Sequence, residues 1–295
     1  MLAVAASARK KHGNDQVPHN AVPAPKDPAP WWLFVCLCRP GKCRVFAAKN
    51  KWLMVVNSGQ PVRTRLICFP DAGADPEQFR DWSADLADHI ELVTLRLPGH
   101  GSRLKETPYA KWQPLLQDSF LALQPLLTEP HAFYGHKFGA RLAYEMACLT
   151  QTQCPGLTQH LFISGCRSPD SQQSTPYLHT LPKDDFIQAL INIGAAPASI
   201  LQDRKLMQLL EPVMRSDYRL SELWSHCQTP SLNVPLTALY GSDDTTDTAA
   251  SMMGWRDFTR REFELIEVSG AHDFVTSQRT RMLQIINTHL GLLGY

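Results

Sequence analysis

The chain has 295 residues, which is enough for one large α/β domain with a sizeable core or for two small domains. Its 29 basic and 28 acidic residues nearly cancel, so the net charge gives no argument for a nucleic-acid partner. No apolar run reaches the roughly 18 to 20 residues of a membrane span. Residues 1–12 carry basic residues after a short apolar run, the reverse of a signal peptide, so a reduced cytoplasmic setting is expected.

Residues 1–62 are expected to form an N-terminal extension that is partly disordered. Prolines and polar residues dominate its first 28 positions, with little apolar periodicity. Residues 52–56 could form a strand, which would either add an edge to the domain or belong to an unrelated extension. Cys36, Cys38 and Cys43 cluster here but lack a fourth ligand at a suitable spacing, so no metal or cofactor is expected.

From residue 63 to residue 295 the pattern predicts one α/β domain. Short apolar runs at 66–69, 92–95, 131–134, 160–164, 235–240 and 263–268 predict strands. Helices are expected after Asp75, which precedes a proline as an N-cap would, and over 112–127, 138–149 and 277–292. Strands that alternate with helices predict a doubly wound, mostly parallel sheet.

Between about residues 182 and 225 the alternation stops and the pattern is helical throughout. Apolar residues recur there at helical spacing. We expect this segment to be a helical insertion that forms a lid over the site.

The stretch Phe133-Tyr134-Gly135-His136-Lys137-Phe138-Gly139-Ala140 runs from a predicted strand into Gly-x-Lys-x-Gly. It resembles the nucleophile elbow of α/β-hydrolases, a sharp strand-to-helix turn that normally reads Gly-x-Ser-x-Gly. Two glycines allow close packing against the turn, and the residue between them is presented to the substrate. In this chain that residue is an amine.

Further motifs in the same order resemble the type II, or editing, thioesterases of polyketide and nonribosomal peptide biosynthesis. The family patterns are Phe-Pro-Tyr-Ala-Gly, Leu-Pro-Gly-Arg-Gly-x-Arg-Leu, Pro-x-x-Arg-Ala-Asp-Phe, an acid loop and Gly-Gly-His-Phe-Phe. The matching segments are Phe69-Pro70-Asp71-Ala72-Gly73, Leu97-Pro98-Gly99-His100-Gly101-Ser102-Arg103-Leu104, Pro212-Val213-Met214-Arg215-Ser216-Asp217-Tyr218, Gly241-Ser242-Asp243-Asp244 and Gly270-Ala271-His272-Asp273-Phe274. The resemblance spans about residues 63–292.

The resemblance implies a site and a substrate class. Lys137 takes the nucleophile position, and His272 transfers the proton. Asp244 orients His272, with Asp243 as the alternative acid. The amides of Ala72 and Phe138 would form the oxyanion hole. The expected partner is an acyl or peptidyl carrier protein with a phosphopantetheine arm, in secondary metabolism that includes siderophore pathways. A monomer without a nucleic-acid or membrane partner is expected.

Lys137 leaves several mechanisms open. An ammonium has no lone pair, and an acyl-lysine amide would hydrolyse far more slowly than an ester. His272 with Asp244 could activate water directly, or the protein could bind an acylated carrier protein without catalysis, as a scaffold or chaperone. Lys137 could also act as a Schiff-base or general-base amine on a carbonyl intermediate, or mark a sequence change in an ordinary thioesterase. A generic esterase or lyase of the same fold, without a carrier partner, is the competing class.

Other candidate residues favour structural roles. His136 beside the elbow is expected to pack or hydrogen-bond, and Ser102 lacks elbow geometry. The adjacent pair His226 and Cys227 is not expected to form a catalytic dyad, because neighbouring side chains rarely face each other. Cys68, Cys148 and Cys166 lie in apolar stretches and are expected in the core.

Overall fold

The computed structural model describes residues 50–56, 61–171, 177–225, 231–271 and 273–291. All of them belong to one compact unit, Cys38–Tyr295, and the other unit, Met1–Leu37, lies outside the described residues. Four sets of residues from the sequence analysis also lie outside them: the 1–28 segment, the N-terminal cysteines Cys36, Cys38 and Cys43, the pair His226 and Cys227, and His272.

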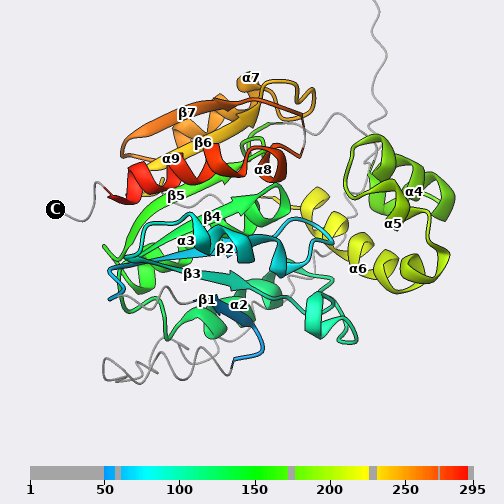
Figure 1. Ribbon diagram of the computed structural model, residues 1–295, viewed down its shortest axis with the longest axis horizontal. Helices are drawn as coiled ribbons and strands as arrows, with labels where there is room; N and C mark the ends of the chain where they lie inside the picture. The colour runs from blue at the N-terminus through cyan, green and yellow to red at the C-terminus, as the bar shows by residue number, and fades with distance from the viewer. Residues whose placement is uncertain (1–49, 57–60, 172–176, 226–230, 272, 292–295) are drawn as a thin grey trace, which may run out of the picture. The chain divides into compact units, whose positions relative to one another are not determined.

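A seven-stranded sheet in the order β1-β3-β2-β4-β5-β6-β7 forms the centre of the described residues (Figure 1). β1 runs antiparallel to β3, and the other neighbouring pairs are parallel. The strands are Leu53–Val56 (β1), Thr64–Phe69 (β2), Ile90–Leu95 (β3), His131–His136 (β4), Thr158–Ser164 (β5), Leu236–Gly241 (β6) and Phe263–Val268 (β7). The predicted α/β class and mostly parallel sheet are confirmed. Residues 53–56 of the predicted extension add an edge strand, which was one of the two alternatives.

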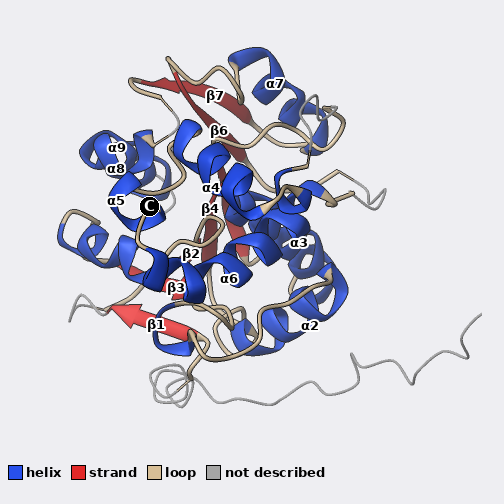
Figure 2. Ribbon diagram, turned by 90° about the vertical axis from the view of Figure 1, so that its right-hand side faces the viewer, coloured by secondary structure: helices blue, strands red, loops and turns tan. Residues whose placement is uncertain are grey.

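Helices cover both faces of this sheet. Figure 2 shows α2 and α3 on one side and α8 and α9 on the other. The α-helices are Trp112–Leu123 (α2), Phe138–Gln153 (α3), Lys183–Asn192 (α4), Ala198–Leu201 (α5), Arg204–Glu222 (α6), Ala249–Met253 (α7), Phe274–Ser277 (α8) and Arg279–Gly291 (α9). The 3-10 helices are Pro76–Ala84 (η2), Gly101–Arg103 (η3), Leu178–Thr180 (η4) and Gly254–Phe258 (η5). None of the helices in the described ranges is both long and apolar enough to cross a bilayer.

The side chains of the buried strands divide into two cores by the two-residue period of a strand. On β2, Ile67 and Phe69 belong to the core beneath α2 and α3, whereas Leu66 and Cys68 belong to the core beneath η2 and α9. Because both faces are covered, β2 is buried at every position. This explains why the sequence shows it as a continuous apolar run rather than an alternating one.

The helix after Asp75 begins where the sequence predicts. The Asp75 carboxylate accepts a hydrogen bond from the Glu77 amide at 2.9 Å, and Pro76 occupies the first position. The segment forms a 3-10 helix, η2, and buries Phe79 and Trp82 against the sheet.

The segment predicted as a helical insertion contains three helices, α4, α5 and α6 (Figure 1). They share a small core of Phe186, Leu190, Leu201, Met207 and Met214. α6 begins at an Asp203 cap, whose carboxylate accepts from the amides of Lys205 and Leu206. The insertion therefore has its own apolar cluster apart from the two cores of the sheet.

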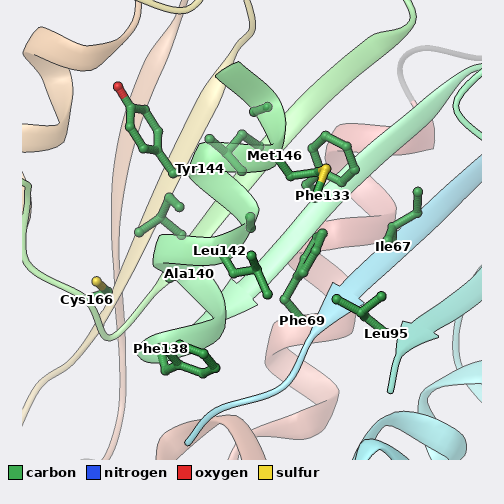
Figure 3. Packing of buried hydrophobic residues seen from close by; sticks show 14 of the residues in the cluster. Ile67, Phe69, Leu95, Phe133, Phe138, Ala140, Leu142, Tyr144, Met146 and Cys166 are labelled. Atoms are coloured by element: carbon green, nitrogen blue, oxygen red, sulfur yellow. The ribbon is translucent and has the colours of Figure 1, made fainter. Parts of the chain in front are cut away.

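The strand β4 turns into α3 in very little space. A Cβ atom on Gly135 would lie 2.3 Å from the Gly139 carbonyl oxygen, and one on Gly139 would lie 2.0 Å from the carbonyl oxygen of Phe69. The end of β2 thus touches the first turn of α3. Phe138, Leu142 and Met146 of α3 lie in the same packed cluster as Phe69 (Figure 3).

We expect Gly139→Ala to lower the free energy of unfolding by more than about 3 kcal/mol, because the added methyl overlaps the β2 backbone, which cannot move aside. Gly291→Ala is the matched control. Nothing lies within 4 Å of its Cβ position at the end of α9, so it should be neutral or stabilise the fold by about 0.5–1 kcal/mol. Urea unfolding measures both. Equal stability of the two variants would contradict the close approach.

Candidate active site

Lys137 occupies the elbow with a strained backbone. Its φ of 50° and ψ of −110° make it the only non-glycine residue with positive φ in the described part of the chain. Such conformations cost about 1–3 kcal/mol and persist where the surrounding packing fixes them. Here the Lys137 amide donates to the Ser164 carbonyl at 2.9 Å, and the flanking glycines hold the turn against β2. The elbow predicted from Gly-x-Lys-x-Gly is present.

The Lys137 side chain lies among carboxylates. Its Nζ is 3.9 Å from Oδ2 of Asp71, and only 16% of the side chain is exposed. Burial lowers the pKa of Lys137, and the charges of Asp71, Asp244, Asp247 and Asp273 oppose that decrease by favouring the ammonium form. The effect of burial is larger than that of the carboxylates, so the pKa of Lys137 lies below the usual value for lysine.

The two amides predicted as the oxyanion hole converge on one atom. Oδ1 of Asp71 accepts from the Ala72 amide at 2.7 Å and from the Phe138 amide at 3.2 Å. The Phe138 amide lies at the N-terminus of α3, where the helix dipole adds positive potential. Two N–H groups aimed at one oxygen are what an oxyanion requires, and a side chain of the protein supplies the oxygen here.

The predicted acid lies on a loop after β6. Asp244 is buried, and its Oδ1 accepts from the amides of Thr246 and Asp247 at 2.8 and 3.0 Å. Asp243, the reserve candidate, is exposed. Asp247 is buried beside them and pairs with Arg167 at 3.2 Å. Of the two predicted carboxylates, Asp244 is the one that is fixed in place.

The loop that carries His272 packs against the acid loop through its described residues. The Asp243 amide donates to the Gly270 carbonyl at 2.9 Å, and a Cβ on Gly241 would lie 2.7 Å from the Ala271 carbonyl oxygen. On the other side, the ring of Phe274 meets His136 edge-on at 5.5 Å. Residues on both sides of His272 therefore contact the acid loop and the end of β4. His272 itself lies outside the described residues, so its predicted approach to Lys137 stays a prediction.

His136 has the structural role that the sequence favours. It is buried, its Nδ1 lies 3.0 Å from Ser164 Oγ, and its ring packs against Gly165 and Phe274. The described residues contain no cluster of three or more His, Cys, Asp or Glu side chains suited to a metal.

Helix α6 lies over the ends of β2 and β3. A Cβ on Gly73 would meet Met214, and one on Gly99 would meet Val213. Asp217 of the same helix accepts from the Gly73 amide at 2.8 Å. The helix is thus bonded directly to the residue that follows Ala72 at the site.

Asp217 also forms a buried pair with His100. The His100 Nε2 is 2.8 Å from Asp217 Oδ2, and its Nδ1 is 3.2 Å from the Pro98 carbonyl oxygen. Both ring nitrogens face acceptor oxygens, and only the imidazolium can donate from both. Burial lowers the pKa of His100, but the Asp217 charge and hydrogen bond, the Pro98 carbonyl and the Asp75 charge outweigh it, so that the pKa is raised.

Sequence reasoning missed two features of this site. It treated Asp71 only as part of a matching motif, although the motif carries tyrosine at that position in the resembling family. It likewise recorded His100 and Asp217 in separate motifs without pairing them. Asp71 and His100 are departures from the family pattern and were the available signals, but only the folded chain shows which residues they contact.

Three comparisons with known proteins agree. The family model for the thioesterase domain matches residues 64–290. The gramicidin S biosynthesis protein GrsT of Aneurinibacillus migulanus is 31% identical over 83% of this chain and 95% of its own. Thioesterase PikA5 of Streptomyces venezuelae is 28% identical over 81% and 85%. Among solved structures, RedJ, a thioesterase from the prodiginine pathway of Streptomyces coelicolor, superposes with a TM-score of 0.73 at 31% identity, covering 79% of this chain and 95% of RedJ.

The His100–Asp217 pair predicts a pH-dependent stability. Because the folded pKa of His100 is raised, its charge stabilises the fold fully below the unfolded pKa of about 6.5 and less as the pH rises through the folded value. We expect His100→Gln to lower the free energy of unfolding by about 1–3 kcal/mol at pH 6 and by clearly less at pH 9.

Urea unfolding of both proteins at the two pH values measures the difference. His89→Gln is the control, because His89 directly precedes β3 whereas His100 follows the other end of that strand; its effect should not follow the same trend. A His100→Gln effect that is equal at both pH values would contradict the charged pair.

Proposed function

The chain belongs to the thioesterase family, and from this premise we propose that it acts on acyl groups held as phosphopantetheine thioesters by carrier proteins of polyketide or nonribosomal peptide assembly lines. The relatives named for gramicidin S biosynthesis and the prodiginine pathway support this substrate class. The observation that carries the proposal is the elbow at Lys137, with paired amides beside it and the acid and histidine loops in contact with each other.

In the proposed hydrolytic route, His272 with Asp244 removes a proton from water, and the resulting hydroxide adds to the thioester carbonyl. Collapse of the tetrahedral intermediate then breaks the C–S bond, and His272 returns the proton to the leaving phosphopantetheine thiolate. Lys137 stands where the family nucleophile stands but does not form the acyl intermediate, because an acyl-lysine amide would not be hydrolysed on the same time scale. The amides of Ala72 and Phe138 are the donors for the oxyanion. The helices α4 to α6 form the proposed lid over the arm and acyl chain.

A second candidate is a non-hydrolytic protein that binds an acylated carrier protein. Two observations favour it: Lys137 places an amine at the elbow, and the Asp71 carboxylate accepts from both amides. Both candidates require recognition of the carrier protein, and they differ in turnover. Lys137-dependent chemistry on a carbonyl intermediate would instead leave a covalent lysine adduct.

We expect the protein to bind a carrier protein that bears an acylated phosphopantetheine arm more tightly than the apo carrier protein without the arm. Isothermal titration calorimetry measures both affinities, with the apo form as the matched control. Equal weak signals for the two forms would contradict the substrate class and leave a generic esterase of the same fold.

We also expect Lys137→Ala to change the slow hydrolysis of the acyl-carrier thioester by less than about threefold, because the water route does not use the amine. Asp244→Asn should lower the rate by at least about tenfold, since it removes the charge that stabilises the histidine. Product release measures the rate of hydrolysis, and intact-protein mass spectrometry detects any covalent adduct. Loss of activity in Lys137→Ala, together with an adduct on Lys137 in the unmodified sequence, would overturn the water route.

A further inference from the structure

We propose that Asp71 supplies a built-in carboxylate that occupies the oxyanion hole, and that Lys137 is its counter-ion, so that the pair holds the site in an acyl-binding state that resists hydrolysis. This inference deepens the proposed function and rests on it for the identity of the thioester. The occupied hole itself is a property of the chain that can be tested without a carrier protein.

The contacts of Asp71 divide between its two oxygens. Oδ1 takes both amide hydrogens, from Ala72 and Phe138, and Oδ2 lies 3.9 Å from the Lys137 Nζ. The side chain is 20% exposed, so it sits at the inner end of the site rather than in bulk water. One carboxylate therefore bridges the backbone donors and the residue in the nucleophile position.

Asp71 Oδ1 occupies the position that the negatively charged oxygen of a tetrahedral intermediate would take. When a nucleophile adds to a thioester carbonyl, the negative charge moves to the carbonyl oxygen, and preorganised N–H donors stabilise it there. Two negative oxygens cannot share the same two donors at hydrogen-bond distance, because their charges repel. A thioester carbonyl can use these amides only after the Asp71 carboxylate has moved away.

Two departures from the family pattern introduce opposite charges that lie close together. The motif at the end of β2 has aspartate where the resembling family has tyrosine, and the elbow has lysine where the family has serine. The first adds a negative charge and the second a positive one, and both are mostly removed from water. Each charge loses part of its hydration, and the opposite charge 3.9 Å away offsets part of that cost.

The pairing also affects the amine. The Asp71 carboxylate stabilises the ammonium form of Lys137, and an ammonium cannot attack a carbonyl. Asp71 thereby opposes both routes to acyl transfer, because it takes the oxyanion donors and favours the protonated form of the lysine. It acts as a positioning residue that determines how the family site is used.

The test compares hydrolysis of hexanoyl-pantetheine, a small thioester that needs no carrier protein, by Lys137→Ser and by the double variant Lys137→Ser with Asp71→Ala. We expect the double variant to be at least about 10²-fold faster, which is the effect of restoring an oxyanion donor. Lys137→Ser with Asp81→Ala is the matched control, because Asp81 is an exposed carboxylate of η2, and its rate should equal that of Lys137→Ser.

Lys137→Ser with Asp71→Asn separates charge from space. An asparagine of the same size still offers an oxygen to the amides but carries no negative charge, so we expect a rate between those of the single variant and the Asp71→Ala double variant. Equal rates for Lys137→Ser and the Asp71→Ala double variant, whether fast or slow, would overturn the proposal.

A second readout uses the natural lysine and does not depend on turnover. Asp71→Asn removes the carboxylate that favours the ammonium, so at pH 8 more of Lys137 should be neutral and react with an acetylating reagent. Peptide mass spectrometry compares Lys137 with the exposed Lys105 of the same molecule. We expect the ratio of their acetylation rates to rise several-fold in Asp71→Asn, and an unchanged ratio would contradict the pairing.

The outcomes separate this inference from the proposed function. If the double variant hydrolyses the small thioester but no form of the carrier protein binds, Asp71 fills the hole and the carrier-protein assignment fails. If the acylated carrier protein binds but Asp71 variants change neither rate nor lysine reactivity, the substrate class holds and the occupied hole is wrong.

Discussion

The site depends on the contact between the end of β2 and the first turn of α3. Gly139 leaves no room for a side chain against the Phe69 carbonyl, so the two backbones meet directly. This contact fixes the strained φ of Lys137 and places the Phe138 amide beside the residues that follow β2. The strain is local, but the two cores that cover the sheet on both faces keep it in place. Without that approach, Asp71 and Lys137 would belong to separate loops.

The charges of Asp71 and Lys137 determine the electrostatics of this site. In a site with little water, a carboxylate close to paired amides and an amine has a stronger effect than the same groups on the surface. Asp71 satisfies donors that would otherwise await a substrate, and Lys137 lies within reach of its second oxygen. The backbone keeps the fold of the thioesterase family, while the side chains of Asp71 and Lys137 balance each other's charge.

The helical insertion and the loop after β3 are joined through a second charged pair, His100 and Asp217. Asp217 accepts from His100 and from the Gly73 amide, so α6 is bonded both to the loop after β3 and to the residue that follows Ala72. A movement of α6 would therefore disturb the turn that carries the Ala72 amide. The charge on this link is carried by a histidine and therefore depends on pH.

The sequence by itself determined the fold class, the positions of the parallel strands and the elbow at Lys137, because buried strands and crowded glycines leave local patterns. It also predicted Asp244 as the acid of the site and the amides of Ala72 and Phe138 as its donors. It did not determine that β1 joins the edge of the sheet or that the helical insertion divides into three helices. Only the tertiary structure decided that Asp71 reaches the Phe138 amide as well as that of Ala72, since the contact with Phe138 joins residues 67 positions apart. Sequence patterns record the periodicity of single elements, whereas contacts between distant loops exist only once the chain has folded.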